Sequence, residues 1–230
     1  MNRDNIELLD NDDLEKSGVV ANCQMNRERQ LTGTNGYERE LRFNPLDLLR
    51  ATHATSGKAK WLDLCCGSAT ALIEAAAIIQ VENLPVTIVG VDLVPSSAGT
   101  EREYDCLHPV EASLSNWQPD GEFDLITCVH GLHYIGDKLG LIARAAGWLT
   151  ERGRFVANLD LNNVKTRDQQ PASRTISAEL RRNGFAYSTR TKLVQCEGRR
   201  QCALGLTYLG ADDTVGPNYT GQAAVDSYYE

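Results

Sequence analysis

The chain of 230 residues lacks features that several classes of protein require. Its seven cysteines include no Cys-x-x-Cys pair, so we expect no zinc site. No apolar run approaches the length of a membrane span. The formal charge is −8, and the chain has no basic stripe to contact the phosphates of a nucleic acid. These absences predict a protein that binds neither a membrane nor a nucleic acid.

The N-terminus also lacks the pattern of a secretory signal peptide. Residues 1–18 are too acidic for such a signal. An odd number of cysteines without a leader suits a reducing compartment. We therefore expect a cytoplasmic protein.

The middle of the chain alternates short apolar runs with helix patterns. Continuous apolar strands separated by helices indicate a parallel sheet with helices on both faces. Strands are expected at 60–64, 86–91, 107–111, 123–129 and 153–159, and helices at 70–80, 137–149 and 173–183. The runs 187–194 and 201–209 are expected to pair as an antiparallel hairpin around a turn at 197–198. The pattern predicts a doubly wound α/β fold.

Composition divides the chain into four segments. Residues 1–36 form an acidic arm that we expect to be poorly packed, and residues 37–57 have a helical apolar pattern. Residues 58–209 form the α/β domain, in which residues 95–100 read as a loop where a crossover helix is usual. Residues 210–230 are a tail rich in Gly and Tyr, either disordered or folded back over a substrate pocket.

A loop of small residues follows the first expected strand. It reads Asp63-Leu-Cys65-Cys-Gly67-Ser-Ala69, and such a loop lets a ligand approach the N–H groups that begin the next helix. The next strand ends at Asp92, whose carboxylate can accept two hydrogen bonds from a ribose diol. The loop has one glycine where a dinucleotide fingerprint has three, and the chain has no P-loop. These features predict a nucleoside-type cofactor that is not a dinucleotide.

Four segments, in the family's order, resemble the class I S-adenosyl-L-methionine (SAM)-dependent methyltransferases. Residues 62–69 are similar to the family's glycine-rich loop, with Gly67 kept and Cys65 and Ala69 in place of two glycines. The other segments are VGVDLVP (89–95), FDLITCVHGLHYI (123–135) and GWLTERGRFVAN (147–158). The resemblance implies a seven-stranded, mainly parallel sheet with an antiparallel last strand, a small N-terminal helical lid and SAM as the cofactor.

The resemblance also implies cofactor-binding residues. They are Tyr37, Arg42, Asp63, Cys65, Gly67, Asp92, Leu93, Ser113, Leu114 and Val129. The family often offers an acid to the adenine amine where this chain has Ala112-Ser113-Leu114, so the Ser113 side chain or the Leu114 backbone is expected at that edge. Trp117 either covers the edge or packs in the core. Arg42 belongs to the expected lid, or pairs with nearby glutamates at helical spacing.

Two histidines follow the fourth expected strand, where the family places groups near the methyl. Methyl transfer requires alignment and exclusion of water, and a hydroxyl nucleophile also needs a base. His130 and His133 are candidates because an imidazole takes up a proton near neutral pH, with His133 slightly ahead. The alternative is that one of them is structural. Tyr134 is expected either to line the substrate pocket or to sit in the core, and Asn158 is expected in the pocket. The fourth expected strand ends without the Asp that metal-dependent members of the family carry, so the resemblance implies no bound metal.

We therefore expect a SAM-dependent methyltransferase that acts on the O or N of a small-molecule acceptor, because no appended recognition domain is visible. One alternative is a methyltransferase acting on a protein or peptide, which an open cleft would favour. A second is a protein of this fold without transferase activity, which the altered glycine loop leaves open. A nicotinamide dehydrogenase is a more distant alternative, and the sequence leaves open a homodimer.

Overall fold

A seven-stranded sheet forms the centre of the computed structural model, which describes residues 7–21, 29–94, 104–168 and 172–230. The strand order is β3-β2-β1-β4-β5-β8-β7. β1 to β5 are parallel, and β8 is antiparallel to both of its neighbours, β5 and β7. The bounds are β1 (Ala59–Leu64), β2 (Val86–Asp92), β3 (Leu107–Glu111), β4 (Phe123–Cys128), β5 (Leu149–Asn158), β7 (Ala186–Ser188) and β8 (Leu193–Glu197). The expected mainly parallel sheet with an antiparallel last strand is confirmed.

Helices cover both faces of this sheet. On one face, α3 (Tyr37–Leu41), α4 (Pro45–Ser56) and α5 (Thr70–Glu82) share a core with Trp61. On the other, α6 (Lys138–Gly147) and α7 (Ser173–Arg182) share a core with Leu62. Neighbouring residues of a strand point to opposite faces, which is why Trp61 and Leu62 lie in different layers. The doubly wound arrangement predicted from the apolar strands is confirmed.

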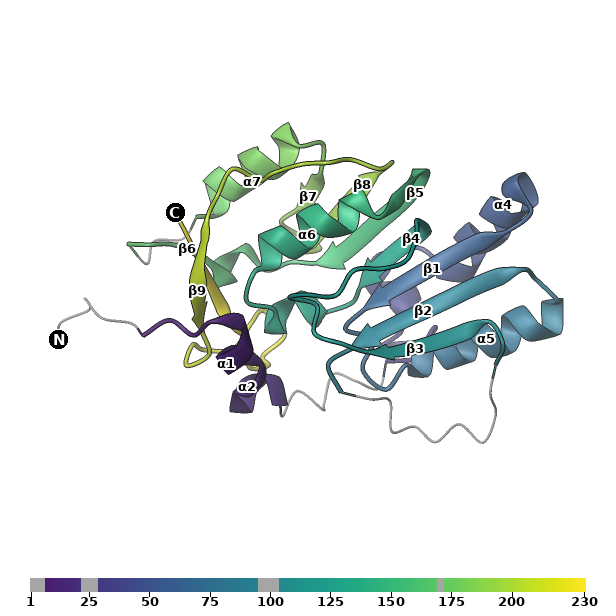
Figure 1. Cartoon of the computed structure of the whole chain (residues 1–230), viewed down its shortest axis with the longest axis horizontal. Coiled ribbons are helices and arrows are strands. Elements are labelled where there is room, and N and C mark those ends of the chain that lie inside the picture. The colour runs from purple at the N-terminus through teal and green to yellow at the C-terminus, as the bar shows by residue number, and fades with distance from the viewer. Residues whose placement is uncertain (1–6, 22–28, 95–103, 169–171) are drawn as a thin grey trace.

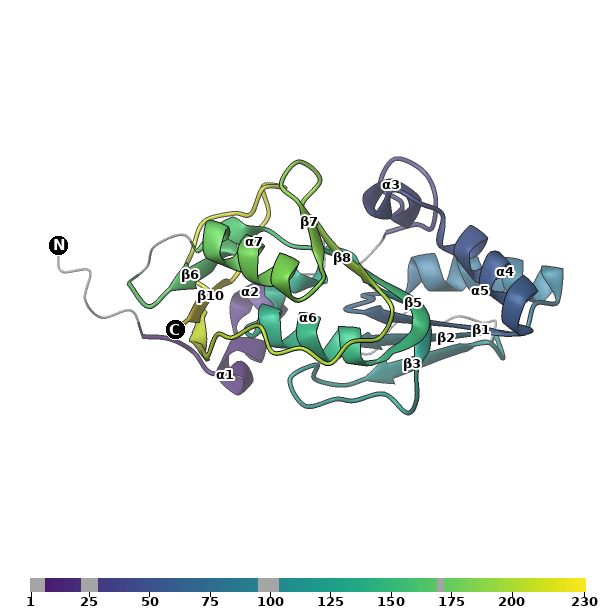
Figure 2. The same cartoon turned by 90° about the horizontal axis from the view of Figure 1, so that it is seen from above.

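A second, three-stranded sheet lies beyond one end of the first. It has the order β6 (Val164–Thr166), β10 (Asp226–Tyr229), β9 (Tyr208–Asp212), and Leu9 forms an isolated bridge with Ala211 of β9. The short helices α1 (Asn11–Glu15) and α2 (Gly18–Ala21) lie beside it, at the end of the molecule away from α4 and α5 (Figures 1 and 2). The short 3-10 helices η2 (Gly131–Tyr134) and η3 (Leu161–Asn163) follow β4 and β5. This end is therefore the carboxyl edge of the parallel strands.

The N-terminal arm is better packed than its composition predicts. Leu14 is 1% exposed, and it shares a buried cluster with Val20 of α2 and with Ala211 and Val225 of the C-terminal tail. The prediction of a poorly packed arm is therefore wrong for residues 7–21. The few apolar side chains of the arm lie on one side and cover the tail, and pairing between distant segments is not visible in local composition.

The predicted C-terminal hairpin is misplaced. The hairpin is formed by β7 and β8 around a turn at 189–192, and residues 201–207 form no strand. Ser188 stabilises this turn by accepting a hydrogen bond from Thr191 N at 3.2 Å on its side-chain oxygen, and Lys192 has a φ of 56°. Residues 210–212 and 226–229 of the tail lie in β9 and β10, so the tail is folded, and its position over a substrate pocket stays a prediction. The predicted loop at 95–100 lies outside the described residues.

Candidate functional site

The loop between β1 and α5 keeps a left-handed backbone at three positions. Cys65, Gly67 and Ala69 have φ values of 58°, 60° and 59°. A residue with a Cβ costs about 1–2 kcal/mol in this conformation, so Cys65 and Ala69 keep the turn at an energetic cost. A Cβ at Gly131, after β4, would collide with the Cβ of Cys65. The loop thus retains the tight path that the sequence resemblance implies, despite the two substitutions.

The carboxylate of Asp92 connects this loop to the end of β2. Its Oδ2 accepts a hydrogen bond from Gly67 N at 2.8 Å, and its Oδ1 accepts one from Val94 N at 3.2 Å. Each carboxylate oxygen has two lone pairs, so acceptor capacity remains for a ligand. The loop and the acid are therefore held together, as a shared cofactor site requires.

Asp92 faces a cavity of about 600 Å³, a volume that includes space open to solvent. Cys65, Leu93 and Leu114 line it too, so four of the predicted cofactor residues meet there. The rest of the wall includes Asn11, Leu14, Glu15 and Val20 from the N-terminal arm, and Ala112, Ser115, Tyr134, Ile135 and Gly136. Tyr134, predicted in the substrate pocket, thus borders this cavity.

The thiol of Cys65 has no nucleophilic character here. Its pKa is raised well above the ordinary value of a thiol, by a hydrogen bond with Cys128 and by burial. A thiol that stays protonated is inert, because the thiolate is the reactive form. Cys65 therefore forms part of the apolar wall of the cavity, as Ala or Gly would at this position.

Tyr37 and Asp63 contact each other beneath the loop and are not among the residues that line the cavity. The Tyr37 hydroxyl donates to Asp63 Oδ2 at 2.7 Å, and the Thr127 hydroxyl donates to Asp63 Oδ1. Burial raises the pKa of Asp63 to about 7. The lid residue Tyr37 is therefore buried as a support for the end of β1.

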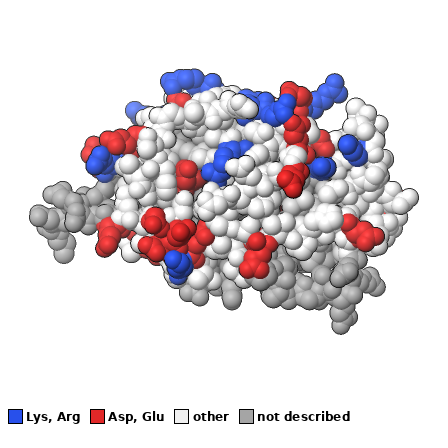
Figure 3. Space-filling model, in the orientation of Figure 1, with Lys and Arg blue, Asp and Glu red and all other residues white. Residues whose placement is uncertain are grey.

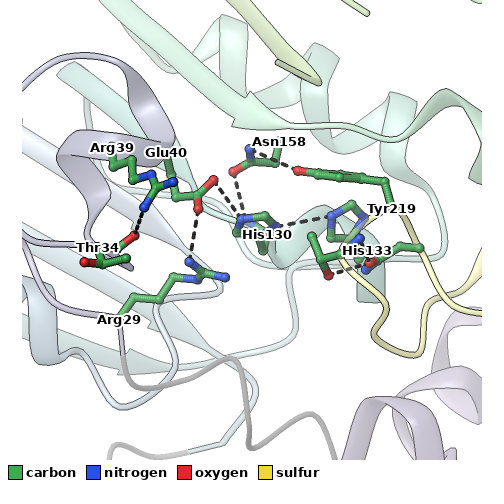
Figure 4. Close-up of polar contacts among 10 residues, drawn as sticks. Arg29, Thr34, Arg39, Glu40, His130, His133, Asn158 and Tyr219 are labelled. Carbon is green, nitrogen blue, oxygen red and sulfur yellow. Dashed lines mark hydrogen bonds and ion pairs between the residues drawn. The ribbon is translucent and has the colours of Figure 1, made fainter. Parts of the chain in front are cut away.

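The two histidines lie side by side at the end of β4 (Figure 4). His130 is 3% exposed and has a φ of 59°, a strained conformation that a residue with a Cβ keeps only where its surroundings enforce it. His130 Nε2 lies 3.0 Å from Glu40 Oε2, and His130 Nδ1 lies 3.4 Å from His133 Nε2. The contact with His130 holds the pKa of Glu40 below its ordinary value. The result is a pair formed by the buried imidazole of His130 and the half-buried carboxylate of Glu40.

His133 has a different environment. It is fully buried, and its Nδ1 has no hydrogen-bond partner within the described part of the chain. Burial, and to a lesser extent the nearby His130, lower the pKa of His133 to about 3. His133 is therefore neutral at ordinary pH and a weak base. Among the described residues, His130 contacts a carboxylate and His133 does not, and the order of the two histidines as candidate bases stays a prediction.

Asn158 and Tyr219 complete the surroundings of the histidines. Asn158 Oδ1 accepts a hydrogen bond from His130 N at 3.2 Å, and Asn158 Nδ2 donates to the Tyr219 hydroxyl at 3.4 Å. The Tyr219 ring centroid lies 5.5 Å from that of His133 and 6.1 Å from that of His130. Tyr219 is 42% exposed, so the ring that contacts both buried histidines also reaches solvent.

Other predicted residues have structural roles in this arrangement. Trp117 packs edge-to-face on Trp148 with 5.9 Å between ring centroids, so of the two alternatives it takes the packed one. Val129 is buried in the core around α5. Arg42 is exposed and ends α3 with a φ of 66°. Ser113 donates a hydrogen bond to Glu15 instead of facing the cavity with a free hydroxyl.

Sequence reasoning missed Glu40 and Arg29. Arg29 Nη1 lies 3.4 Å from Glu40 Oε1, on the far side of that carboxylate from His130. One signal for Glu40 is present, because Glu40 follows Tyr37 by three residues on a helix and shares its face. A buried Tyr37 therefore brings Glu40 toward the interior. No local signal marks Arg29.

Two features are absent from the described residues. Nowhere in residues 7–21, 29–94, 104–168 and 172–230 do three or more His, Cys, Asp or Glu side chains cluster so that they could hold a metal ion. Among the helices in those ranges, none is long and apolar enough to cross a membrane.

Comparisons with solved structures find similar folds at low identity. They include coclaurine N-methyltransferase bound to N-methylheliamine and SAH (15% identity, 57% of this chain and 38% of that chain, TM-score 0.41). They also include the [4+2]-cyclase SpnF (15%, 56% and 48%, 0.41) and the plantazolicin methyltransferase BpumL with a monoazolic desmethylPZN analog and SAH (13%, 63% and 50%, 0.40). The chain thus spans half or less of the length of these proteins.

Comparison with sequence families gives a direct assignment. No curated protein sequence matches the chain. Residues 36–195, more than half of the chain, match the family model described as a methyltransferase domain. This region contains the four segments in which the sequence resembles class I methyltransferases. The chain therefore belongs to the methyltransferase-domain family, with the class I Rossmann-like fold.

Proposed function

We propose that the protein transfers a methyl group from SAM to the oxygen or nitrogen of a small-molecule acceptor. The observation that carries the proposal is the cavity at the carboxyl ends of β1 and β2, where the Asp92 carboxylate lies beside apolar Leu93 and Leu114. Ligands of open α/β sheets bind at this edge. When bound, SAM supplies a methyl group already activated on a sulfonium, so the protein has to bind, orient and exclude water.

The cavity residues fit the adenosine part of SAM. Asp92 has acceptor capacity for the two ribose hydroxyls, and a carboxylate is the side chain that best accepts two such bonds. Leu93 and Leu114 offer apolar surface to a planar base. The tight loop at 65–69 lets the ligand approach the start of α5.

The Glu40–His130 pair supplies the base in this proposal. When the proton of the neutral His130 ring is on Nε2, 3.0 Å from Glu40 Oε2, the lone pair of the ring is on Nδ1. The 3.4 Å contact from Nδ1 to His133 is longer than an ordinary N–H hydrogen bond, so it is weak. A proton from the acceptor hydroxyl or ammonium passes to Nδ1, and Glu40 stabilises the resulting imidazolium.

The burial of this pair supports a small acceptor over a protein or peptide. His130 is covered by Glu40 from α3 and by Tyr219 from the tail. An acceptor that reaches Nδ1 displaces Tyr219, the exposed member of the group. A folded protein does not fit at the position of the Tyr219 ring, whereas a small molecule that takes the place of this one phenol ring fits there.

The experiment has a binding stage and a turnover stage. Calorimetric titration with SAM, S-adenosylhomocysteine (SAH) and NADH tests the cofactor, and we expect the first two to bind and NADH not to. Labelled SAM with a panel of phenols and amines then tests transfer. His130→Asn should lower the rate about 100-fold or more and leave SAH affinity unchanged, and His53→Asn, a histidine on α4, is the control. Absence of SAH binding would favour a protein of this fold without transferase activity.

A further inference from the structure

Glu15, on the N-terminal helix α1, reaches the far side of the same cavity. Its Oε1 accepts hydrogen bonds from Ser113 Oγ at 2.6 Å and from Ser115 Oγ at 2.9 Å. Both serines follow β3, so two segments about a hundred residues apart in the chain meet at this carboxylate. Glu15 is half-buried and lies in the cavity wall together with Asp92.

This carboxylate differs from the other acids of its helix. Asp12 and Asp13 are exposed, and acidic side chains gather on the surface over α1 (Figure 3). Glu15 points inward from that surface and is held by two hydroxyls. The hydrogen bonds that the described residues make to it both end on Oε1. Oε2 therefore keeps its acceptor capacity for a ligand.

The polar character of the cavity selects the kind of ligand group that Glu15 takes. Among the described residues, its lining includes two carboxylates, Asp92 and Glu15, and no Lys or Arg. Carboxylates accept hydrogen bonds and donate none, so this wall recognises groups that carry N–H or O–H. Leu93 and Leu114 form apolar wall in the same cavity. A nucleoside has one set of donors on its ribose and, when the base is adenine, a second set on the exocyclic amine.

We infer that Glu15 binds the exocyclic amine of the adenine ring of SAM. The inference rests on the proposed function, in which Asp92 takes the ribose hydroxyls of the same ligand. Ser113 and Ser115 position the carboxylate by holding Oε1, and Oε2 accepts the amine N–H. Ser113 thus acts through Glu15, where the sequence suggested direct contact. Glu15 also lies outside residues 36–195, so this recognition is separate from the matched domain.

The assignment predicts that the affinity for the ligand depends on the exocyclic substituent of its base. In an inosyl analogue the exocyclic amine is replaced by a carbonyl oxygen, which faces the Glu15 carboxylate without a proton between them. A site built to bind a donor rejects an analogue that lacks it, because its acceptor is then unpaired. The wild-type protein should bind SAH at least about 10-fold more tightly than S-inosylhomocysteine.

The test is the ratio of these two affinities, measured by calorimetric titration in the full chain. Glu15→Gln, whose amide can donate to the carbonyl, and Glu15→Ala should both lower the ratio about 10-fold or more. Asp12→Asn makes the same charge change on an exposed residue of α1 and should keep the wild-type ratio. Circular dichroism confirms that the variants are folded.

The other possible results overturn either the assignment of Glu15 alone or the proposed function together with it. If Glu15 only fastens α1 to the segment after β3, its substitution weakens both ligands equally and the ratio does not change, which overturns the assignment while the proposed function stands. A wild-type protein that binds both ligands equally has the same consequence. If SAH does not bind to the wild-type protein, both the proposed function and this assignment fail.

Discussion

The buried carboxyl of Asp63 should make the stability of the protein fall as the pH rises. Asp63 is fully buried at the centre of the sheet, where the hydroxyls of Tyr37 and Thr127 are its hydrogen-bond donors. Burial raises its pKa from the ordinary value of 3.8 to about 7. The perturbation is Asp63→Asn, which keeps the size and one carbonyl acceptor but removes the ionisation.

The sign follows from proton uptake. Between about pH 4 and pH 7 the folded protein keeps the Asp63 proton and the unfolded chain loses it, so the folded state binds more protons and the free energy of unfolding decreases with rising pH. Above about pH 7 both states are ionised, and the cost of the buried charge is fully present. At 1.36 kcal/mol per pKa unit, the rise from 3.8 to about 7 corresponds to up to about 4 kcal/mol.

Urea unfolding at several values from about pH 4 to about pH 8 measures this effect. The wild-type protein should lose up to about 4 kcal/mol across that range relative to Asp63→Asn. Asp124→Asn is the control, since Asp124 is also a strand carboxylate with two donors, Lys60 N and the Thr150 hydroxyl, but it is only half-buried. Parallel pH curves for the wild-type protein and Asp63→Asn would refute the reasoning.

Three further predictions address the cofactor site and the tail. Asp92→Ala should weaken SAH binding by about 1–3 kcal/mol, because the ribose hydroxyls lose a charged acceptor; unchanged affinity in a calorimetric titration would place the ribose elsewhere. Arg42→Gly should raise the free energy of unfolding by about 1 kcal/mol and leave SAH affinity unchanged, because its φ of 66° suits glycine. Weaker SAH binding in that variant would return Arg42 to the site. Lys138→Met should lower the free energy of unfolding by about 2 kcal/mol or more, because the buried Nζ of Lys138 donates hydrogen bonds to two carbonyls and to Ser227 Oγ. A free energy of unfolding in urea within about 0.5 kcal/mol of the wild-type value would contradict this.

The main sheet was predictable because its strands carry their signal locally. An apolar run that is buried on both faces shows its type and extent in a few residues, and β2 and β4 have bounds within one residue of those that the sequence indicates. The second sheet has no such signal. β10 pairs with β6 and β9, which lie about 15 to 60 residues away, and its two tyrosines are equally typical of an exposed tail. Its existence depends on contacts between segments that the local pattern does not connect.

The same distinction separates the site residues that were predicted from those that were not. Asp92 and Leu93 follow a strand of the parallel sheet, so the position of the cofactor edge locates them. Glu40 and Glu15 belong to helices before the first strand, and Tyr219 to a loop of the tail. Each reaches the site only through tertiary packing. The sequence therefore identified one wall of the cavity and the two histidines. The remaining three residues, Glu15, Glu40 and Tyr219, were identified from the structure.

This division implies different roles for the two parts of the molecule. Asp92, Leu93 and His130 belong to the matched domain, and they provide the elements that a methyl transfer from SAM needs in the proposed function. Tyr219 lies outside that domain and is the 42% exposed side chain that contacts the 3% exposed His130. In the proposed function the acceptor takes the place of Tyr219, so the tail selects which acceptor reaches the base. The sequence of the tail can then change without altering the loop at 65–69 or the Asp92 site.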